Sequence, residues 1–222
     1  MKAMLLAAGR GERLRPLTDT LPKPLVCVGG RPLIVWHLNA LARAGFRDVV
    51  INLSWLGEQV RAALGDGGEF GVTLHYSEEA PVALETGGGI LRALPLLGPA
   101  PFLVVSADIW TDLDFARLRL EPQALAHLVM VANPPHHPRG DFGLEGDVIV
   151  SSAAERLTYG NVGIYRPEFF EGCPPGRFPL KAPLDRAIAA GRVRGELFQG
   201  QWCDVGTPAR LAELNARLAQ VQ

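Results

Sequence analysis

Two glycines, an arginine and a lysine near the N-terminus have the types and spacing of a phosphate-binding loop. Gly9 and Gly11 follow the apolar run of residues 4–8, and Arg13 and Lys23 come shortly after them. Closely spaced glycines let backbone N–H groups turn toward a ligand and let that ligand approach the main chain. Fixed cations beside such a turn favour the binding of a polyphosphate. The sequence therefore predicts a nucleotide-phosphate site.

This loop lacks the signatures of two common phosphate-binding motifs. Leu14 stands where the dinucleotide fingerprint Gly-x-Gly-x-x-Gly requires its third glycine. No Gly-Lys-Ser/Thr follows, so the loop is not a Walker P-loop either. A nicotinamide-dependent oxidoreductase is accordingly the least favoured of the enzyme classes considered.

Two aspartates end apolar stretches far apart in the chain. Asp108 follows the apolar run 102–105, and Asp204 follows Trp202 and precedes Gly206. An ionised carboxylate at the end of a buried strand needs a partner, which could be a helix N-terminus, loop amides or a cation. Mg²⁺ prefers a few hard oxygen ligands. Each aspartate alone suits either role, but together with the phosphate site they favour a magnesium site.

Strands and helices alternate through the first half, which predicts an α/β fold with a Rossmann-like, mostly parallel sheet and helices on both faces. The carboxyl ends of the parallel strands, where Gly9 and Asp108 lie, should form the ligand crevice. The expected strands are 4–8, 48–53, 72–76 and 102–105, and the expected helices are 32–44, 55–64 and 90–94.

The second half has shorter strands and more turns, which is typical of a small antiparallel insertion, here expected to lie over the parallel core. A last helix should begin with Thr207 as N-cap and Pro208 as its first residue. The other expected elements are strands at 126–131, 148–150, 161–165 and 195–198 and a helix at 182–190. Because no linker separates the halves, we expect a single domain, 1–222, with a nucleotide part (1–125), a sugar part (126–200) and a closing part (201–222).

Composition argues against several kinds of partner. The 222 residues carry 22 Lys and Arg against 23 Asp and Glu, a net charge of −1, so no basic footprint for nucleic acid or a membrane surface is present. The chain opens without an apolar leader, and we expect a cytoplasmic protein. The three cysteines share no metal-ligand spacing.

Residues 4–25 resemble the signature of the sugar-1-phosphate nucleotidyltransferases. Two positions depart from that signature: Glu12 replaces a threonine and Cys27 replaces a proline. Further similar segments are E-T-G-G-G at 85–89, R-G-D-F at 139–142 and W-C-D-V-G-T at 202–207. The first two, together with Glu12, look like the form found in uridylyltransferases that act on N-acetylmuramate α-1-phosphate. The matching signature residues are Gly9, Gly11, Arg13, Leu14, Pro16, Leu17, Thr18, Pro22, Lys23, Pro24 and Leu25.

The resemblance implies the nucleotidyltransferase fold and a reaction in which UTP and a sugar 1-phosphate, with Mg²⁺, give a UDP-sugar and pyrophosphate, in the recycling of cell-wall sugars. It implies catalytic roles for Lys23 and Arg13 and metal ligation by Asp108 and Asp204. The implied nucleotide-binding residues are Ala8, Gly9, Arg10, Gly11, Glu12, Arg13, Glu85, Gly87 and Gly88. The implied sugar-phosphate-binding residues are Lys23, Arg139, Asp141, Gly143 and Asn161.

Three points stay open at the level of the sequence. The glycines at 87–89 suit a nucleobase lying against the main chain, but also a helix start or a flexible loop. Arg139 is a hypothetical partner for the lactyl carboxylate of muramate, because a guanidinium matches a carboxylate. The sugar could instead be mannose or glucose 1-phosphate with guanine or thymine as base, or the chain could be a non-catalytic nucleotide-sugar-binding regulator. The presence of all four residues implied in catalysis and metal binding argues against such a regulator; they are Lys23, Arg13, Asp108 and Asp204.

Overall fold

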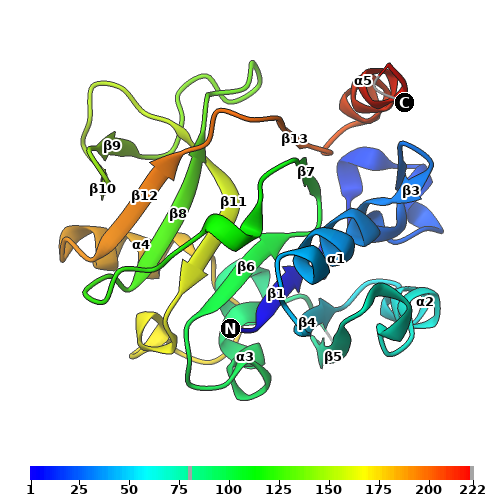
Figure 1. Ribbon diagram of the computed structural model, residues 1–222, viewed down its shortest axis with the longest axis horizontal. Coiled ribbons are helices and arrows are strands. Elements are labelled where there is room, and N and C mark those ends of the chain that lie inside the picture. Colours follow the sequence, from blue (N-terminus) through cyan, green and yellow to red (C-terminus); the bar gives the residue numbers. More distant parts are fainter. Residues whose placement is uncertain (80–81, 221–222) are drawn as a thin grey trace.

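A computed structural model describes residues 1–79 and 82–220, and its centre is a nine-stranded sheet (Figure 1). The strands hydrogen-bond in the order β5-β4-β1-β6-β11-β8-β12-β10-β9. Their bounds are β1 (Ala3–Leu6), β4 (Asp48–Leu53), β5 (Thr73–Glu78), β6 (Phe102–Ser106), β8 (Ala126–Val131), β9 (Gly143–Glu145), β10 (Val148–Val150), β11 (Thr158–Tyr165) and β12 (Val193–Leu197).

The first four strands of this order are parallel, and β1, β4 and β6 are largely buried on both faces, whereas the edge strand β5 is partly exposed. β1 pairs in parallel with β4 and with β6, and β4 pairs in parallel with β5. Successive side chains of a strand point to opposite faces. Leu5 and Val105 accordingly join one core cluster, and Met4 and Val104 join the other. Burial on both faces explains why β1, β4 and β6 read as nearly continuous apolar runs.

Helices cover both faces of the sheet, which confirms the predicted α/β architecture. α1 (Leu33–Arg43) and α2 (Gly57–Leu64) pack on one face, where Ile34 and Val60 enter the first core cluster. α3 (Glu85–Leu97) and α4 (Lys181–Ala189) pack on the other, where Ile90 and Leu184 enter the second. Figure 1 shows α1 and α3 on either side of β1.

The strands of the second half continue the sheet edge to edge, instead of lying over the parallel core as expected. β11 is antiparallel to both of its neighbours, β6 and β8, and β12 then pairs in parallel with β8. Val162 and Ile164 of β11 pair with Val105 and Leu103 of β6. These apolar side chains extend the existing core clusters, so no second layer is needed.

Short strands that the sequence did not reveal connect the C-terminal helix to the rest. They are β2 (Cys27–Val28), β3 (Arg31–Pro32), β7 (Ile109–Thr111) and β13 (Trp202–Asp204). α5 (Pro208–Ala219) follows β13, and Leu214 packs with Val28 and Trp110 in a third, smaller core cluster. Its predicted start is confirmed, because the Thr207 side chain accepts a hydrogen bond from Arg210 N at 3.3 Å.

One helix boundary differs markedly from the prediction. The helix expected at 90–94 is α3, which begins at Glu85 and includes all three glycines in its first turns. The glycines permit close packing there instead of breaking the helix: a Cβ at Gly88 would lie 2.1 Å from the carbonyl oxygen of Gly176. A glycine can either break a helix or let another segment pack closely against it, and the sequence does not distinguish the two.

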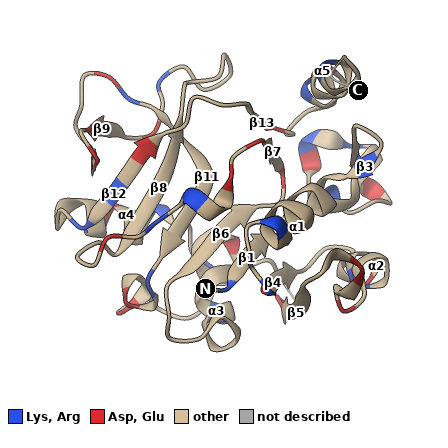
Figure 2. Ribbon diagram, in the orientation of Figure 1, with Lys and Arg blue, Asp and Glu red and all other residues tan. Residues whose placement is uncertain are grey.

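The surface carries both signs of charge, and Figure 2 shows acidic and basic residues interspersed over both halves of the ribbon. Among residues 1–79 and 82–220, no helix combines the length and apolar character needed to cross a lipid bilayer.

Candidate active site

Two adjoining cavities lie where the parallel strands end. The glycine-loop cavity, of about 610 Å³, is lined by the loop after β1 and by Lys23 and Asp108. The β11 cavity, of about 700 Å³, is lined by residues that include Asn161 and Asp204. Leu6, Arg13 and Thr86 line both. The two cavities therefore meet beside the Arg13 guanidinium, close to both aspartates.

The glycine loop is held by a turn that only glycine adopts easily. Gly11 has φ +66°, and a Cβ there would lie 3.0 Å from Thr18 Cγ2 and 3.1 Å from Lys23 Cβ. Thr18 Oγ1 donates a hydrogen bond to Gly11 O at 2.8 Å. Arg10 lies over the Trp55 ring, 4.5 Å from its centroid. At Gly9, in contrast, a Cβ would meet nothing within 4 Å, so that part of the backbone faces open space.

Lys23 and Asp108 form an ion pair on the wall of the glycine-loop cavity. Lys23 is buried, with only 8% of its surface exposed, and its Nζ lies 2.6 Å from Asp108 Oδ2. Ser106 Oγ donates to the other carboxylate oxygen at 2.7 Å. Burial alone would raise the pKa of Asp108, but Lys23, Ser106 and the charge of Arg13 together lower it. Asp108 is thus held as a carboxylate.

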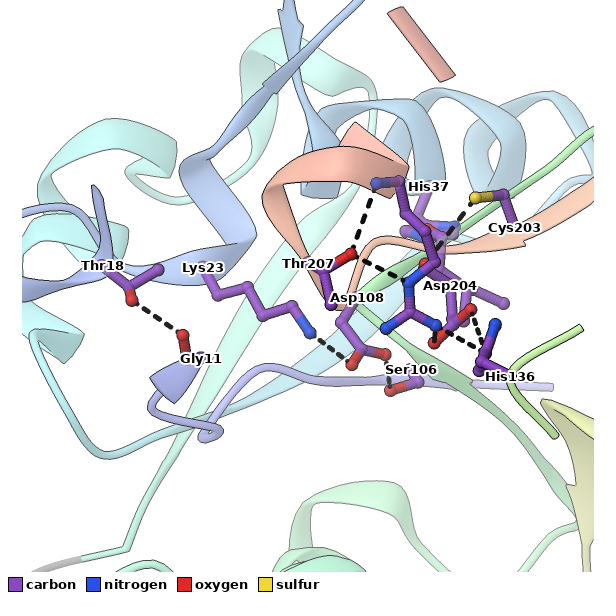
Figure 3. A network of polar contacts seen from close by, with 12 residues as sticks. Gly11, Thr18, Lys23, His37, Ser106, Asp108, His136, Cys203, Asp204 and Thr207 are labelled. Carbon is purple, nitrogen blue, oxygen red and sulfur yellow. Dashed lines mark hydrogen bonds and ion pairs between the residues drawn. The ribbon is translucent and has the colours of Figure 1, made fainter. Parts of the chain in front are cut away.

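Asp204 lies on the neighbouring strand β13 and has an arginine and a histidine as partners of its own. β13 is antiparallel to β7, with Asp204 opposite Ile109, and Val205 N donates to Asp108 O at 2.8 Å. Asp204 Oδ2 accepts from Arg210 Nη1 at 2.6 Å, and Asp204 Oδ1 lies 3.0 Å from His136 Nε2. Figure 3 shows the Lys23–Asp108 pair beside Asp204 and His136.

Gly206 leaves room for two guanidinium groups at this point. A Cβ on Gly206 would lie 2.1 Å from Arg210 Nη2 and 3.2 Å from Arg13 Nη2. The W-C-D-V-G-T segment thus brings an acid, Asp204, and two arginines together around one glycine. Arg210 was not singled out from the sequence, because an arginine in the first turn of a helix has no distinctive spacing.

The two carboxylates offer hard oxygen ligands of the kind that Mg²⁺ prefers. Magnesium is usually held by one or two carboxylates together with substrate phosphates, not by a complete protein cage. Within the described parts of the chain, no cluster of three or more His, Cys, Asp or Glu side chains has the arrangement of a metal site. Asp108 and Asp204 therefore fit a magnesium ion that binds together with phosphate groups.

A buried polar chain fixes the floor of the glycine-loop cavity. Asn52 Oδ1 accepts from Ala7 N at 2.7 Å, and Asn52 Nδ2 donates to Glu79 Oε1 at 2.6 Å. Glu79 Oε2 accepts from Leu84 N at 2.7 Å. Both side chains line the cavity and are almost fully buried. They tie the end of β1 to the segment before α3, and sequence reasoning missed both.

Of the residues in the E-T-G-G-G segment, only the first two line the glycine-loop cavity. Glu85 does so with φ +59°, which is rare for a residue with a side chain, and it pairs with Arg177 at 2.8 Å. Gly87 and Gly88 are absent from the wall of either cavity. A Cβ on Gly87 would lie 2.4 Å from the Phe178 ring, so these glycines serve the packing of α3.

The β11 cavity contains a strained asparagine. Asn161 has φ +57° at the irregular register between β11 and β8, where a β-bulge turns its exposed side chain into the cavity wall. Non-glycine residues in this region cluster at functional sites. Asp141 also lines this cavity, but it accepts from Tyr159 N at 2.8 Å and lies 3.0 Å from His137 Nε2. Asp141 thus anchors the loop 133–142.

Two residues predicted to bind the sugar phosphate lie outside both cavities. Arg139 is exposed and lines neither cavity. Gly143 is buried in β9, and a Cβ there would lie 2.2 Å from Ala153 Cβ, so it serves packing. Arg156 and Lys181, which carried no motif, line the cavity instead.

The predicted residues that the structure brings to the cavity walls are accordingly Ala8, Gly9, Arg10, Gly11, Glu12, Arg13, Lys23, Glu85 and Asp108 in the first cavity, and Arg13, Asp141, Asn161 and Asp204 in the second.

Comparisons with known proteins show what this chain is similar to. The family model described as nucleotidyl transferase matches residues 2–152. A protein from Neisseria meningitidis serogroup B named N-acetylmuramate alpha-1-phosphate uridylyltransferase is 52% identical over 225 residues, covering 97% of each chain. One of the same name from Caulobacter vibrioides is 37% identical and covers 98% of this chain and 97% of its own.

A solved structure also shares the fold. A putative glucose-1-phosphate thymidylyltransferase from Bacillus anthracis superposes with a TM-score of 0.87 at 20% identity, covering 100% of this chain and 96% of its own. At this identity the likeness concerns the fold alone.

Proposed function

The chain belongs to the nucleotidyl transferase family, and on that premise we propose that it transfers UMP from UTP to N-acetylmuramate α-1-phosphate. The products are the UDP-sugar and pyrophosphate. The names of the two near-full-length relatives support the sugar and the base. We further propose that the protein works in the cytoplasm, where nucleoside triphosphates are available, and returns cell-wall sugars to nucleotide-activated form.

The observation that carries this proposal is the meeting of two cavities beside Arg13, Lys23 and the two aspartates. The glycine-loop cavity, lined by residues of 1–125 and by Gly206, takes the nucleotide, and the β11 cavity, formed mainly within 126–200, takes the sugar. Their junction is where the α-phosphate of UTP and the phosphate of the sugar must come together.

In the reaction, an oxygen of the sugar phosphate forms a bond to the α-phosphorus of UTP, and the bond from that phosphorus to the oxygen bridging to the β-phosphate breaks. The nucleophile is already an anion near neutral pH, so no general base is required. The difficulty is mutual repulsion, and catalysis comes from positioning and charge neutralisation.

The residues around the junction of the two cavities have separate roles in positioning the substrates and neutralising their charge. Lys23 holds the incoming sugar phosphate near the α-phosphorus, since its Nζ lies beside Asp108 on the wall of the glycine-loop cavity. Arg13 and the amides of residues 9–11 steady the β- and γ-phosphates. Arg10, Glu12 and Glu85 border the nucleotide and Asn161 borders the sugar.

Asp108 and Asp204 would hold Mg²⁺ together with the phosphates, and the ion would neutralise charge and act as a template. Before such binding, each aspartate is neutralised by Lys23 or Arg210. These two cations are therefore available for phosphate oxygens once the carboxylates are otherwise engaged.

The proposal is tested with a substrate matrix. Each of UTP, dTTP, GTP and CTP is combined with the 1-phosphates of N-acetylmuramate, N-acetylglucosamine, glucose and mannose, and pyrophosphate release is measured with Mg²⁺. We expect the highest kcat/KM for UTP with N-acetylmuramate 1-phosphate. If kcat/KM were instead highest for GTP with mannose 1-phosphate, or for dTTP with glucose 1-phosphate, the chain would be assigned the corresponding activity of another member of the family. Absence of pyrophosphate release with every pair would favour a nucleotide-sugar-binding regulator.

A further inference from the structure

The β11 cavity is lined by five side chains that are cationic or can become so. They are Arg13, His136, His137, Arg156 and Lys181. Three of them already contact carboxylates. These contacts are His136–Asp204 at 3.0 Å, His137–Asp141 at 3.0 Å and Lys181–Asp185 at 2.6 Å.

Among the described residues, the two arginines of this cavity have no carboxylate partner within 4.0 Å. Arg13 also lines the glycine-loop cavity, where the proposed function assigns it to the phosphates of UTP. Arg156 lines the β11 cavity only. A guanidinium has five N–H donors. Within residues 1–79 and 82–220, the single hydrogen bond of the Arg156 side chain runs from Nη2 to Ser151 O at 2.8 Å, so most of its donors are unused there.

The backbone on both sides of Arg156 is fixed before any ligand binds. Asn133 Nδ2 donates to Arg156 O at 2.8 Å. The next residue, Leu157, forms a bridge with Phe142, in which Leu157 N donates to Phe142 O at 2.8 Å. Gly140 packs so close that a Cβ there would lie 2.9 Å from the Arg156 carbonyl carbon. Such preorganisation lowers the entropy cost of binding.

The position of Arg156 along the cavity suits a group at the far end of the sugar. Trp202 Nε1 donates to Gly160 O at 2.9 Å, which places Gly160 beside the strand that carries Asp204. Arg156 precedes Gly160 by four residues, a backbone separation of at most about 13 Å at about 3.3 Å per residue. A sugar whose phosphate lies near Asp204 thus extends toward Arg156.

We propose that Arg156 binds the lactyl carboxylate of N-acetylmuramate α-1-phosphate and thereby selects this substrate over sugar phosphates that lack an acid. The inference rests on the proposed function. It replaces Arg139 in that role, because Arg139 lies outside the cavity. The lactyl ether is carried at C3 of the ring, two carbons from the phosphate-bearing C1. A guanidinium fork binds such a carboxylate through two parallel hydrogen bonds.

The test compares two substrates that differ only in the lactyl group. Pyrophosphate release is measured at saturating UTP with N-acetylmuramate 1-phosphate and with N-acetylglucosamine 1-phosphate, for wild type, Arg156→Gln, Arg156→Lys and Arg139→Gln. Where turnover is too slow, binding is measured by titration calorimetry. We expect Arg156→Gln to lose about 10- to 100-fold in kcat/KM on the muramate substrate, the size of a hydrogen bond to a charged group, mainly through KM. On the glucosamine substrate, kcat/KM of Arg156→Gln should differ from the wild-type value by less than about threefold, which is the range of ordinary surface substitutions.

Arg156→Lys should recover part of the loss, and Arg139→Gln should match wild type on both substrates. An equal loss of Arg156→Gln on both substrates, no loss on either, or a selective loss in Arg139→Gln would overturn the assignment. Wild type itself reports on the proposed function. If it ignores the muramate substrate, the proposed function and the inference both fail; if wild type prefers muramate and Arg156→Gln keeps that preference, only the inference fails.

Discussion

Lys23 Nζ and Asp108 Oδ2 lie 2.6 Å apart on the cavity wall, although 85 residues separate them in sequence. The Lys23 side chain is only 9% exposed, whereas the Asp108 side chain is 36% exposed. The lysine stem passes beneath the glycine loop, where a Cβ on Gly11 would meet its Cβ and Cδ. The ammonium group is thereby held beside the aspartate that closes β6, at the place where charge must be neutralised.

Replacing Asp108 by Asn should remove most of the activity. The change keeps the shape and the hydrogen bond from Ser106, but it removes the charge that faces Lys23 and the proposed metal. Loss of one electrostatic stabiliser in an active site typically costs about 100- to 1,000-fold in kcat. The measurement is pyrophosphate release at saturating substrates and Mg²⁺.

Asp114→Asn is the matched control for that variant. Asp114 lies six residues farther on, lines neither site cavity, and accepts from Ala116 N as a helix cap, which Asn also does. Asp114→Asn should unfold near the wild-type temperature, whereas Asp108→Asn should unfold at a lower one, because the buried Lys23 ammonium loses its partner; activities are therefore compared at a temperature where both variants are folded. Asp108→Asn with near wild-type turnover in Mg²⁺ would show that the metal assignment is wrong.

We expect Arg210 to compete with the proposed metal ion for Asp204, because its Nη1 lies 2.6 Å from Asp204 Oδ2. Arg210→Met keeps the aliphatic stem and removes the charge. A half-buried ion pair of this kind is worth up to about 1 kcal/mol. The Mg²⁺ concentration for half-maximal activity should therefore fall by about two- to fivefold.

The control for Arg210→Met is Arg217→Met on the same helix, where the guanidinium lies over Trp110 and away from both cavities. It should leave the magnesium dependence unchanged. A half-maximal concentration that rises in Arg210→Met would mean that Arg210 orients Asp204 for the metal instead of competing with it.

Two glycines of the predicted nucleotide site should respond in opposite ways to alanine. Gly88→Ala places a methyl group 2.1 Å from Gly176 O, and such overpacking costs about 1–3 kcal/mol, which outweighs the gain of about 1 kcal/mol for alanine in a helix. Gly9→Ala meets nothing within 4 Å, so stability should hold while the KM for UTP rises. Urea unfolding and UTP titration measure the two effects. If Gly88→Ala were as stable as wild type but had lost UTP binding, Gly88 would be a nucleotide-binding residue after all.

These glycines show where sequence reasoning reaches its limit. The letter G stands equally for a positive φ, for open backbone and for close packing, and only the packed chain distinguishes Gly11, Gly9 and Gly88. The buried strands β1 and β6 were predictable because a strand covered on both faces must be apolar throughout. Asp108 could then be singled out as a site residue, because an ionised carboxylate at the end of a buried strand needs a partner.

Other site residues have no local signal at all. β7 and β13 are three residues long and pair across more than 90 positions, so no periodicity reveals them. Arg156 and Arg210 are polar residues next to a strand and in a helix, where arginines are ordinary. Their partners, Ser151 O and Asp204, became visible only in the folded chain. Thr207 and Pro208 were predictable because capping is determined within one turn.

His37 makes the stability of the protein depend on pH. It is 2% exposed in α1, and its Nε2–H donates to Ile109 O at 2.8 Å, the residue after Asp108. Burial lowers the pKa of His37 from 6.5 to about 4, against the opposing effects of that hydrogen bond and of Asp108. Between about pH 6.5 and 4, His37 is therefore protonated in the unfolded chain but stays neutral in the folded chain. Stability falls as the pH drops from about 6.5 to 4, by about 3 kcal/mol in total for this one group.

His37→Gln should make that dependence shallower, because the amide can still donate to Ile109 O but does not titrate. Free energies of unfolding in urea are compared at pH 7 and pH 4.5, and the difference between them should shrink by about 2 to 3 kcal/mol relative to wild type. His75→Gln, at a partly exposed histidine on β5, controls for the loss of an imidazole as such. If His37→Gln is destabilised by the same amount at both pH values, the imidazole contributes packing and hydrogen bonding alone, and the acid sensitivity of the fold has its origin elsewhere.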